Sequence, residues 1–302
     1  MKNYIYLLIV SFFVLTSCSQ EEEIIDLASQ NKPGKEKVSI CHYDEENDTW
    51  HTITISENAL KAHIGHGDRV AGGCEDYTYV PDDNFERALI DFYGCEDIMD
   101  DYVLTSNIDG ITVLSLREKN IEDLTGIEDF TSLQTLNIPL NKLTSIDVSN
   151  NVNLITINCP SNFLSKLDVS GLPKLVNVIT DRNLLTELDV SDTPRLVNIT
   201  AHRNILTQIN LSNTPRLVLL SCSINKLKNL DLSNNFALTR IYLKNNDLER
   251  LIVKNGNFVN VTKFQTRGNP LLSCIEVDDA AYSTANWTNI DSWTSFSEDC
   301  GY

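Results

Sequence analysis

The feature that most constrains this chain is an asparagine that recurs every 21 residues. It occupies positions 141, 162, 183, 204, 225 and 246, and Asn269 follows after 23 residues. Each asparagine lies within the pattern L-x-x-L-x-L-x-x-N-x-L or a close apolar variant, as in the segments that begin at Leu133 and Leu238. One repeat of this length cannot bury its own leucines, whereas stacked repeats share a continuous core. The period therefore predicts a solenoid.

Within each predicted turn, the apolar positions should face the core. In the third turn these are Leu175, Val178, Leu185, Leu188 and Val190. We interpret the recurring asparagine as a buried ladder whose amides satisfy backbone groups where the chain bends. The repeated "DVS" predicts a second short extended segment on the other side of each turn. Three prolines then fix φ and favour loops over helices there: Pro173, Pro194 and Pro215.

This repeat resembles the leucine-rich repeat family, including internalin-like bacterial surface proteins, over residues 112–272. The resemblance implies an α/β-type solenoid that is mostly β. We expect a right-handed leucine-rich-repeat superhelix with a concave parallel sheet and a loop-rich convex side.

Both ends of the solenoid resemble the caps of that family. Residues 77–111 should form a helical N-terminal cap, with Asp82 or Asp83 as the helix N-cap and Gly94 as the stop. Four residues follow helical spacing within it: Phe85, Ala88, Leu89 and Phe92. Residues 273–302 should form a C-terminal cap, with aromatic residues between two cysteines.

The N-terminus predicts export and a lipid anchor. Residues 1–17 contain Lys2 and a short apolar run, as in a secretory signal peptide. Leu15-Thr16-Ser17-Cys18 resembles a bacterial lipobox, with cleavage before Cys18 and acylation of that residue; the alternative is an ordinary signal peptide with an incidental cysteine. Residues 18–36 form an acidic linker that resembles an outer-membrane export tag. We expect a lipid-anchored protein of the outer membrane, exposed on the cell surface, with the lipid as its only membrane contact.

The charge of the chain narrows the choice of partners. It has 24 basic and 42 acidic residues, a net charge of −18, and loss of Lys2 with the signal peptide makes this −19. Such a surface disfavours nucleic acid and anionic lipid, which both require cationic patches. We therefore expect an extracellular protein or glycan as the partner and no nucleic acid.

The cysteines divide into bridged and free ones in an oxidising compartment. We predict disulfides Cys41–Cys74 and Cys274–Cys300. Cys159 and Cys222 occupy equivalent positions three repeats apart, which is about 14 Å at the spacing of neighbouring strands. That distance exceeds the reach of a disulfide, so these two thiols should be free and buried. Cys95 has no assignment.

Residues 37–76 predict a small histidine- and cysteine-rich module. "SICHYDEENDTWHTITI" reads as a hairpin in which His42 faces His51, and Ser56 should cap a helix that carries His63 and His66. Gathered imidazoles can bind zinc or another divalent metal, so His42, His51, His63 and His66 are hypothetical metal ligands. The alternative is that these polar residues bridge and cap a core that is too small to stabilise itself. No other cofactor is expected.

A ligand surface is predicted on the last two strands of the concave sheet. The outward positions of the earlier strands are mostly small and neutral, whereas these two carry Arg240, Tyr242 and Lys244, then Lys263, Gln265 and Arg267. Exposed cations side by side repel, so an anionic or carbohydrate ligand would explain them, with Tyr242 for stacking and His202 as an extension. The alternative is that they offset Asp247, Glu249 and the acidic C-terminal cap.

A row of aspartates also repeats: Asp147, Asp168, Asp189 and Asp231. The row is either a cation-binding strip or a solvated face whose carboxylates accept local backbone hydrogen bonds. The sequence contains no motif for a catalytic nucleophile or a phosphate loop, so we expect no enzyme activity. The chain is interpreted as a surface binding or adhesion protein. The alternatives are metal-dependent activity in the histidine module, or a purely structural envelope component.

Overall fold

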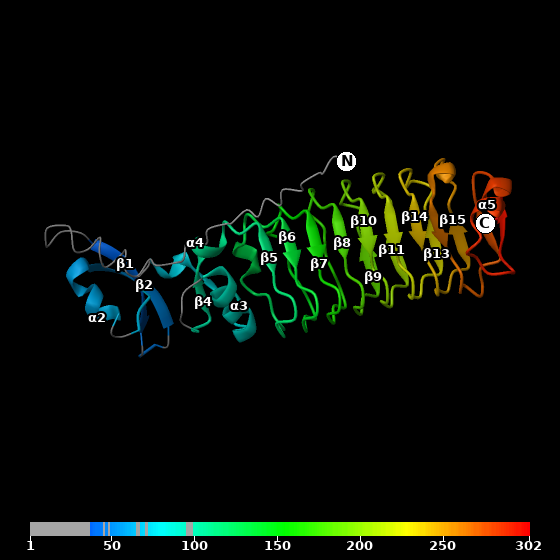
Figure 1. The fold of residues 1–302 in the computed structure, drawn as a ribbon. Helices are drawn as coiled ribbons and strands as arrows, with labels where there is room; N and C mark the ends of the chain where they lie inside the picture. Colours follow the sequence, from blue (N-terminus) through cyan, green and yellow to red (C-terminus); the bar gives the residue numbers. More distant parts are fainter. Residues whose placement is uncertain (1–36, 45, 48, 65–66, 70–71, 95–98) are drawn as a thin grey trace, which may run out of the picture. The chain divides into compact units, whose positions relative to one another are not determined.

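The computed structural model describes residues 37–302 except 45, 48, 65–66, 70–71 and 95–98 (Figure 1). Contacts divide the chain into two compact units, one ending at Cys74 and one made of Glu75–Tyr93 with Ile98–Tyr302. Cys18, His66 and Cys95 lie outside the described residues, so their predicted roles are untested. Among the described helices, none is long and apolar enough to cross a bilayer.

The N-terminal unit begins with the predicted hairpin. Strands β1 (Lys37–Asp44) and β2 (Thr49–Ser56) are antiparallel, and His42 lies opposite His51, as expected. The Asp44 carboxylate accepts hydrogen bonds from the backbone amides of Glu46 and Asn47 at 3.0 and 3.3 Å. An aspartate that binds the amides two and three residues ahead stabilises a tight turn.

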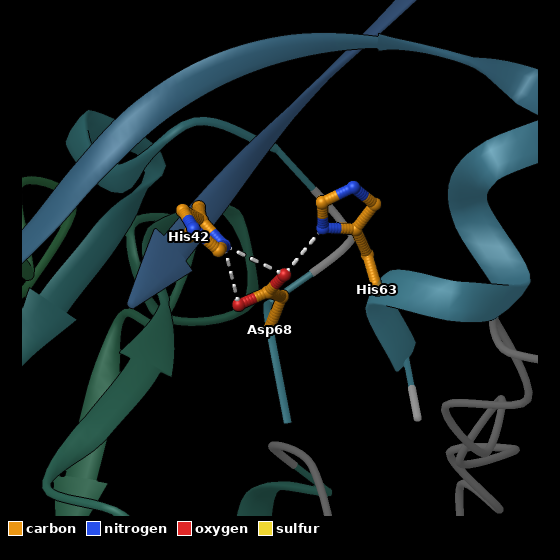
Figure 2. A group of neighbouring side chains, drawn as sticks. All are labelled: His42, His63 and Asp68. Atoms are coloured by element: carbon orange, nitrogen blue, oxygen red, sulfur yellow. Dashed lines mark hydrogen bonds and ion pairs between the residues drawn. The ribbon is translucent and has the colours of Figure 1, made fainter. Parts of the chain in front are cut away.

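The helix after the hairpin starts differently from the prediction. A 3₁₀ turn, η1 (Glu57–Ala59), leads into α2 (Leu60–Ile64), and Ser56 stands at the cap position but its side chain makes no capping hydrogen bond. After α2 the chain reverses at Gly67, whose φ of +84° is left-handed and suits glycine. The Asp68 amide then donates to the carbonyl of His63 at 3.2 Å, so Asp68 lies beside His63 (Figure 2).

A disulfide closes this unit. Cys41 and Cys74 are bonded, as predicted, before the short η2 turn (Cys74–Asp76). Cys41 also exchanges two backbone hydrogen bonds of 2.9 Å with Arg69. The segment that carries Asp68 is thereby fixed against β1 next to His42.

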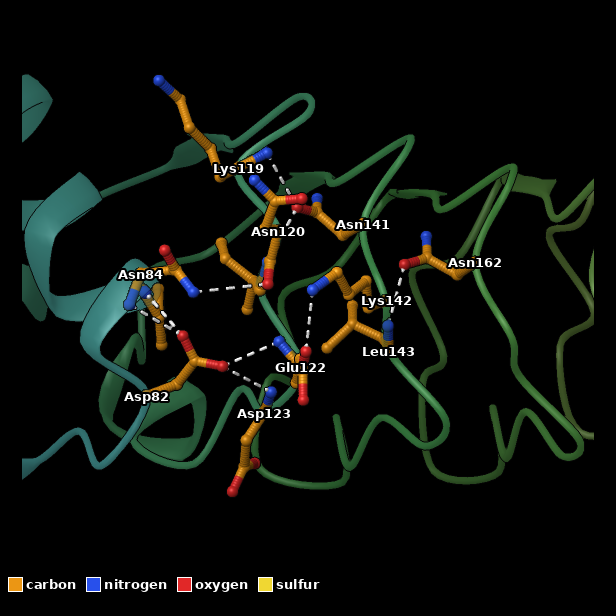
Figure 3. A network of polar contacts seen from close by, with 12 residues as sticks. Asp82, Asn84, Lys119, Asn120, Glu122, Asp123, Asn141, Lys142, Leu143 and Asn162 are labelled. Atoms are coloured by element: carbon orange, nitrogen blue, oxygen red, sulfur yellow. Dashed lines mark hydrogen bonds and ion pairs between the residues drawn. The ribbon is translucent and has the colours of Figure 1, made fainter.

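The second unit opens with the predicted cap. Strands β3 (Tyr77–Tyr79) and β4 (Tyr102–Leu104) pair, and helices α3 (Asp83–Tyr93) and α4 (Thr105–Ile108) accompany them. Asp82, rather than Asp83, caps α3 by accepting from the amides of Asn84 and Phe85, both at 2.9 Å. Its other oxygen accepts from the amides of Glu122 and Asp123, which joins the cap to the first turn (Figure 3).

One of the four apolar residues expected in the cap is not in the core. Phe85, Ala88 and Leu89 are buried, but Phe92 is 54% exposed. The ammonium of Lys119 lies 3.9 Å from the centre of the Phe92 ring. Phe92 lies on the side of α3 that this long cationic side chain covers, and a cation–π contact replaces core packing there.

The solenoid itself is a stack of turns with one large parallel sheet along one side and two smaller parallel sheets on the other (Figure 1). We call the large one the main sheet. Its eight strands are, in spatial order, β5 (Val113–Ser115), β6 (Thr135–Asn137), β7 (Thr156–Asn158), β8 (Asn177–Ile179), β10 (Asn198–Thr200), β12 (Leu219–Ser221), β14 (Arg240–Tyr242) and β16 (Lys263–Gln265). Every strand is three residues long, and its central residue is buried.

The other side of the turns carries shorter sheets and loops. Strands β9 (Glu187–Asp189) and β11 (Gln208–Asn210) pair where two "DVS"-type segments stand. A second group is β13 (Asn229–Asp231), β15 (Arg250–Ile252), β17 (Cys274–Glu276) and β18 (Ser295–Ser297). Within residues 112–272 the described helical segments are only two 3₁₀ turns, η3 (Ile127–Asp129) and η4 (Phe258–Asn260). The mostly β, loop-rich turns agree with the prediction.

The asparagine ladder joins each turn to the one before it. Asn162 is typical: its side-chain oxygen accepts from the amide of Leu143 at 3.1 Å, and its Nδ2 donates to the carbonyls of Ile138 at 3.0 Å and Cys159 at 3.1 Å. The same pattern recurs at Asn183, Asn204, Asn225 and Asn246. These asparagines are buried, so the ladder satisfies backbone groups that water cannot reach.

A left-handed residue precedes every ladder asparagine, which the sequence analysis did not anticipate. Non-glycine residues hold φ between +53° and +61° at Leu140, Ser161, Arg182, Arg203, Ile224 and Asn245. This conformation costs a non-glycine residue about 1–2 kcal/mol. The ladder bonds of the next residue over-determine the turn and maintain it. At Gly268 an added side chain would collide with the Asn245 side chain, which would have to move.

The C-terminal cap closes the last turn. Helix α5 (Ala280–Asn286) is capped by Asp279, and Cys274 is bonded to Cys300, as predicted. Trp287 is buried and stacks on Phe264 with ring centres 4.4 Å apart. The Asp291 carboxylate accepts from the amides of Gly268 and Asn269 at 2.8 and 2.9 Å. The cap therefore supplies the hydrogen bonds that a further turn would have made.

Cys159 and Cys222 are free and buried, as predicted. Burial raises the pKa of each thiol to about 12. At neutral pH both are thus protonated and behave as small apolar side chains.

We predict that Asn204→Ala lowers the free energy of unfolding by about 2 kcal/mol, because it leaves the buried Leu185 amide without a partner and removes one of the two donors to the Thr180 carbonyl. The half-buried Asn198 lies in the same turn on the face of the main sheet, where its side chain bonds only to Asn177. Asn198→Ala should cost less than about 1 kcal/mol. Urea unfolding followed by circular dichroism measures both. Equal losses would contradict the ladder's role.

We predict that iodoacetamide at pH 8 leaves Cys159 and Cys222 unmodified in the folded chain, because the thiolate is the reactive form and burial suppresses it. Both should be alkylated in 6 M guanidinium (roughly the concentration that unfolds stable domains). Peptide mass mapping reads each cysteine separately. Rapid labelling of either residue in the native protein would refute the buried assignment.

Candidate functional site

Most of the main sheet's outer face is occupied by its own hydrogen bonds. Asn158 donates to the side chain of Asn137 at 2.7 Å, and Asn198 donates to that of Asn177 at 2.7 Å. Asn177 in turn donates to the hydroxyl of Thr156 at 3.0 Å. These outward residues on β6, β7, β8 and β10 are half-buried. Their amide groups form hydrogen bonds across neighbouring strands, so these neutral side chains already have polar partners within the sheet.

The last two strands of the sheet and the residues directly after them carry what we call the cationic patch: Arg240, Lys244, Lys263 and Arg267. Arg240 and Lys263 lie side by side in register on β14 and β16, and both are exposed. Arg267 is exposed and Lys244 is half-buried. Among the described residues, the ion pairs of the solenoid join Lys142 to Glu122 and Lys166 to Asp168. None of them involves the cationic patch, Asp247 or Glu249, so no described acidic residue forms an ion pair with the patch.

A shallow depression of ≈ 400 Å³ adjoins the patch. It brings together three predicted ligand residues, His202, Tyr242 and Lys244, whereas Arg240, Lys263 and Arg267 are not part of its lining. The other lining residues are Ser221, Ser223, Ile224, Asn245 and Gln265. Sequence reasoning missed Ile224 and Asn245 because the left-handed turn presents them here. The one sequence signal for these two residues is that each directly precedes a ladder asparagine.

Three hydrogen bonds fix the residues around the depression. The His202 amide donates to the Asp181 carboxylate at 2.7 Å, and that carboxylate also accepts from the Thr200 hydroxyl at 3.1 Å. The Lys244 amide donates to the Ser223 hydroxyl at 3.1 Å. Backbone positions on neighbouring turns are thereby fixed, and the side chains of His202 and Lys244 remain available to a ligand.

The aspartate row behaves as a solvated face. The Asp168 and Asp189 carboxylates each accept from the amide and the hydroxyl of the serine two residues ahead, at distances of 2.7 to 3.0 Å. These bonds hold the pKa of both carboxyls below the usual value. Residues of the row line a second depression of ≈ 260 Å³. Because local groups satisfy these carboxylates, the geometry favours the solvated-face interpretation over a cation strip.

The N-terminal unit contains a separate cluster of two histidines and an aspartate (Figure 2). Nδ1 of His42 lies 3.0 and 2.9 Å from the two Asp68 oxygens, and Nδ1 of His63 lies 2.6 Å from one of them. The Asp68 side chain is 1% exposed. Burial raises the pKa of this carboxyl, but the hydrogen bonds from His42 and His63 outweigh burial and leave the pKa lowered.

The structure modifies the predicted metal set. It brings His42 and His63 together and adds Asp68, which was not among the predicted ligands. The ring of His51 is 5.4 Å from that of His42, edge to face, and His51 is exposed. His51 is therefore a neighbour of the cluster rather than a member of it.

No protein-family model and no curated protein matches this chain. Solved structures do. The functional domain of InlJ from Listeria monocytogenes, whose description notes a cysteine ladder, is 30% identical, with a TM-score of 0.52 over 67% of this chain and 52% of that one. An internalin (inlF) from the same organism is 19% identical, with a TM-score of 0.58 over 72% of this chain and 71% of that one. Internalin C2 from Listeria monocytogenes is 20% identical, with a TM-score of 0.56 over 72% of this chain and 95% of that one.

The fold is an internalin-like leucine-rich-repeat solenoid. The likenesses to the internalin (inlF) and to internalin C2 rest on the fold, because the sequence identity is low. The chain spans about half the length of the solved InlJ structure. They establish the stacked parallel-sheet architecture. The site must then be argued from this chain's own residues, because a fold does not assign a function by itself.

Proposed function

We propose that this chain is a cell-surface binding protein that captures an anionic ligand on the C-terminal part of its main sheet. The ligand is a sulfated or carboxylated glycan, or an acidic protein segment. The contact surface consists of the cationic patch together with the depression that His202 and Tyr242 line. The proposal covers adhesion and ligand capture, because both use the same contact.

The observation that carries this proposal is the unpaired state of the cationic patch. A chain with a net charge of −18 has many carboxylates available, yet none of the described acidic residues forms an ion pair with these four cations. Adjacent unpaired cations repel and destabilise the fold slightly. An external anion would relieve that repulsion, and arginine presents a planar fork of donors suited to carboxylate or sulfate.

The depression supports a specific contact rather than general attraction. Half-buried Tyr242 offers a ring for stacking on a sugar, and the neighbouring hydroxyls and amides offer hydrogen bonds: Ser221, Ser223, Asn245 and Gln265. Extended sheet faces of solenoids are common binding surfaces. The internalin-like fold therefore agrees with a binding role, and the charge pattern supplies the choice of ligand class.

We predict that Arg240→Glu with Lys263→Glu weakens retention of heparin, a sulfated glycan, and of poly-L-glutamate by at least tenfold, which corresponds to about 1.4 kcal/mol. The physical reason is that two attractive contacts become repulsive. Biolayer interferometry at about 0.15 M salt, where screening is physiological, measures both probes. A loss for heparin alone selects a glycan, and a loss for poly-L-glutamate alone selects an acidic protein segment.

The matched control is Lys174→Glu with Arg195→Glu, which makes the same charge change on two exposed residues of neighbouring turns outside the main sheet. Its binding should stay within threefold of the unaltered chain. Equal losses in the two double variants would mean that net charge alone governs binding. No retention of either probe by the unaltered chain would leave the proposal without support and favour a structural envelope role.

We further propose that Cys18 is acylated and anchors the protein to the outer membrane with its repeats outside the cell. The lipobox-like segment and the acidic residues after it support this, and both precede the described residues. Cys18→Ala should release the chain from the membrane fraction or block its maturation. Membrane-bound, normally processed Cys18→Ala protein would rule out the lipid anchor. Protease digestion of intact cells tests surface exposure separately.

A further inference from the structure

We propose that the N-terminal unit binds one zinc ion through Nδ1 of His42, Nδ1 of His63 and the carboxylate of Asp68 (Figure 2). One ligand atom from each residue lies within 4.8 Å of the other two. Among the residues that the structure describes, this is the one group of three or more such side chains arranged closely enough for a metal. The site lies outside the solenoid and does not depend on the ligand proposed for the main sheet.

The ligand types select the ion. Two imidazoles and one carboxylate form a mixed nitrogen–oxygen set that suits zinc, whereas magnesium and calcium prefer oxygen alone. Zinc–nitrogen and zinc–oxygen bonds of about 2.0–2.2 Å in a tetrahedron separate the ligand atoms by about 3.3 Å. The three atoms are now 2.6 to 3.0 Å apart across the Asp68 contacts. Each imidazole nitrogen would have to move away from the Asp68 carboxylate by less than about 1 Å to reach that separation.

The ligands are held in place before any ion arrives. His42 follows Cys41, which is disulfide-bonded to Cys74 and exchanges two backbone hydrogen bonds with Arg69. Arg69 in turn follows Asp68, so the same contacts fix both ligands. The Asp68 amide bonds to the carbonyl of His63, the third ligand. Preorganisation of this kind lowers the entropy lost on binding.

Charge and access also favour a cation here. The Asp68 side chain is 1% exposed, while those of His42 and His63 are 32% and 22% exposed. A buried carboxylate needs a positive partner, and zinc supplies one more strongly than a hydrogen-bonded imidazole does. The ion can enter from the side of the partly exposed imidazoles, and the fourth zinc position would be left to solvent.

Isothermal titration of the chelator-treated mature chain with zinc chloride tests this assignment. We expect one equivalent to bind. His42→Ala and Asp68→Asn should each weaken binding by at least tenfold, since each removes one of three ligands. The control, His202→Ala, removes a histidine of the solenoid and should leave zinc affinity unchanged. Peptide mapping of the Cys41–Cys74 disulfide verifies that each variant has folded.

A second measurement protects the test against misfolded variants. X-ray absorption at the zinc edge of the unaltered, zinc-loaded chain should report two imidazole ligands and oxygen. Absence of stoichiometric zinc binding, a ligand set without two imidazoles, or full zinc affinity in folded His42→Ala and Asp68→Asn proteins would each overturn the proposal. Loss of heparin binding in Arg240→Glu with Lys263→Glu bears only on the main sheet, so the two proposals can fail separately.

Discussion

The hydrogen bonds of the ladder asparagines are the interaction on which the solenoid depends. Each of these side chains accepts a hydrogen bond from a backbone amide of the preceding turn and donates one to a backbone carbonyl of that turn. Asn204 does so with the Leu185 amide and the Thr180 carbonyl. Apolar burial drives the turns together but is not directional. The amide bonds set the register, because a shift of one residue would leave buried backbone groups without partners. They also hold the left-handed residue before each asparagine in a conformation that it would otherwise avoid.

Fixed register has a direct consequence for the surface. Side chains at equivalent positions of successive turns form straight rows, and a row of like groups must either satisfy itself or repel. The aspartates bond to serines in their own turns, and the amides of the main sheet bond to one another across turns. The cationic patch is where this self-satisfaction stops, since Arg240 and Lys263 stand side by side without an acidic partner among the described residues. We therefore place the proposed ligand contact where the repeating surface pattern changes.

The N-terminal unit follows a different strategy. Its core is too small for apolar burial to hold it alone, and a disulfide with a polar cluster carries the connection between the hairpin and the later segment. The contact of two imidazoles with one buried carboxylate provides both cross-linking and a ligand set for a metal ion. The structural role and the proposed metal-binding role therefore use the same three side chains. Measured zinc binding distinguishes the two roles, whereas a loss of stability in a variant would be expected for either one.

The sequence alone determined the solenoid, its period and the buried free thiols, because the 21-residue spacing from Asn141 to Asn246 fixes which residues face inward and how far apart equivalent cysteines lie. It also determined both described disulfides, whose cysteines bracket the N-terminal module and the C-terminal cap. It also located the change in surface chemistry at Arg240 and Lys263. Tertiary structure decided the features that depend on contacts between distant segments. Asp68 joined His42 and His63 through the reversal at Gly67, Ile224 and Asn245 reached the depression through left-handed turns, and Phe92 left the core to meet Lys119. The spacing predicts rows of equivalent side chains along successive repeats. The approach of side chains from different elements depends on backbone reversals that the period does not encode.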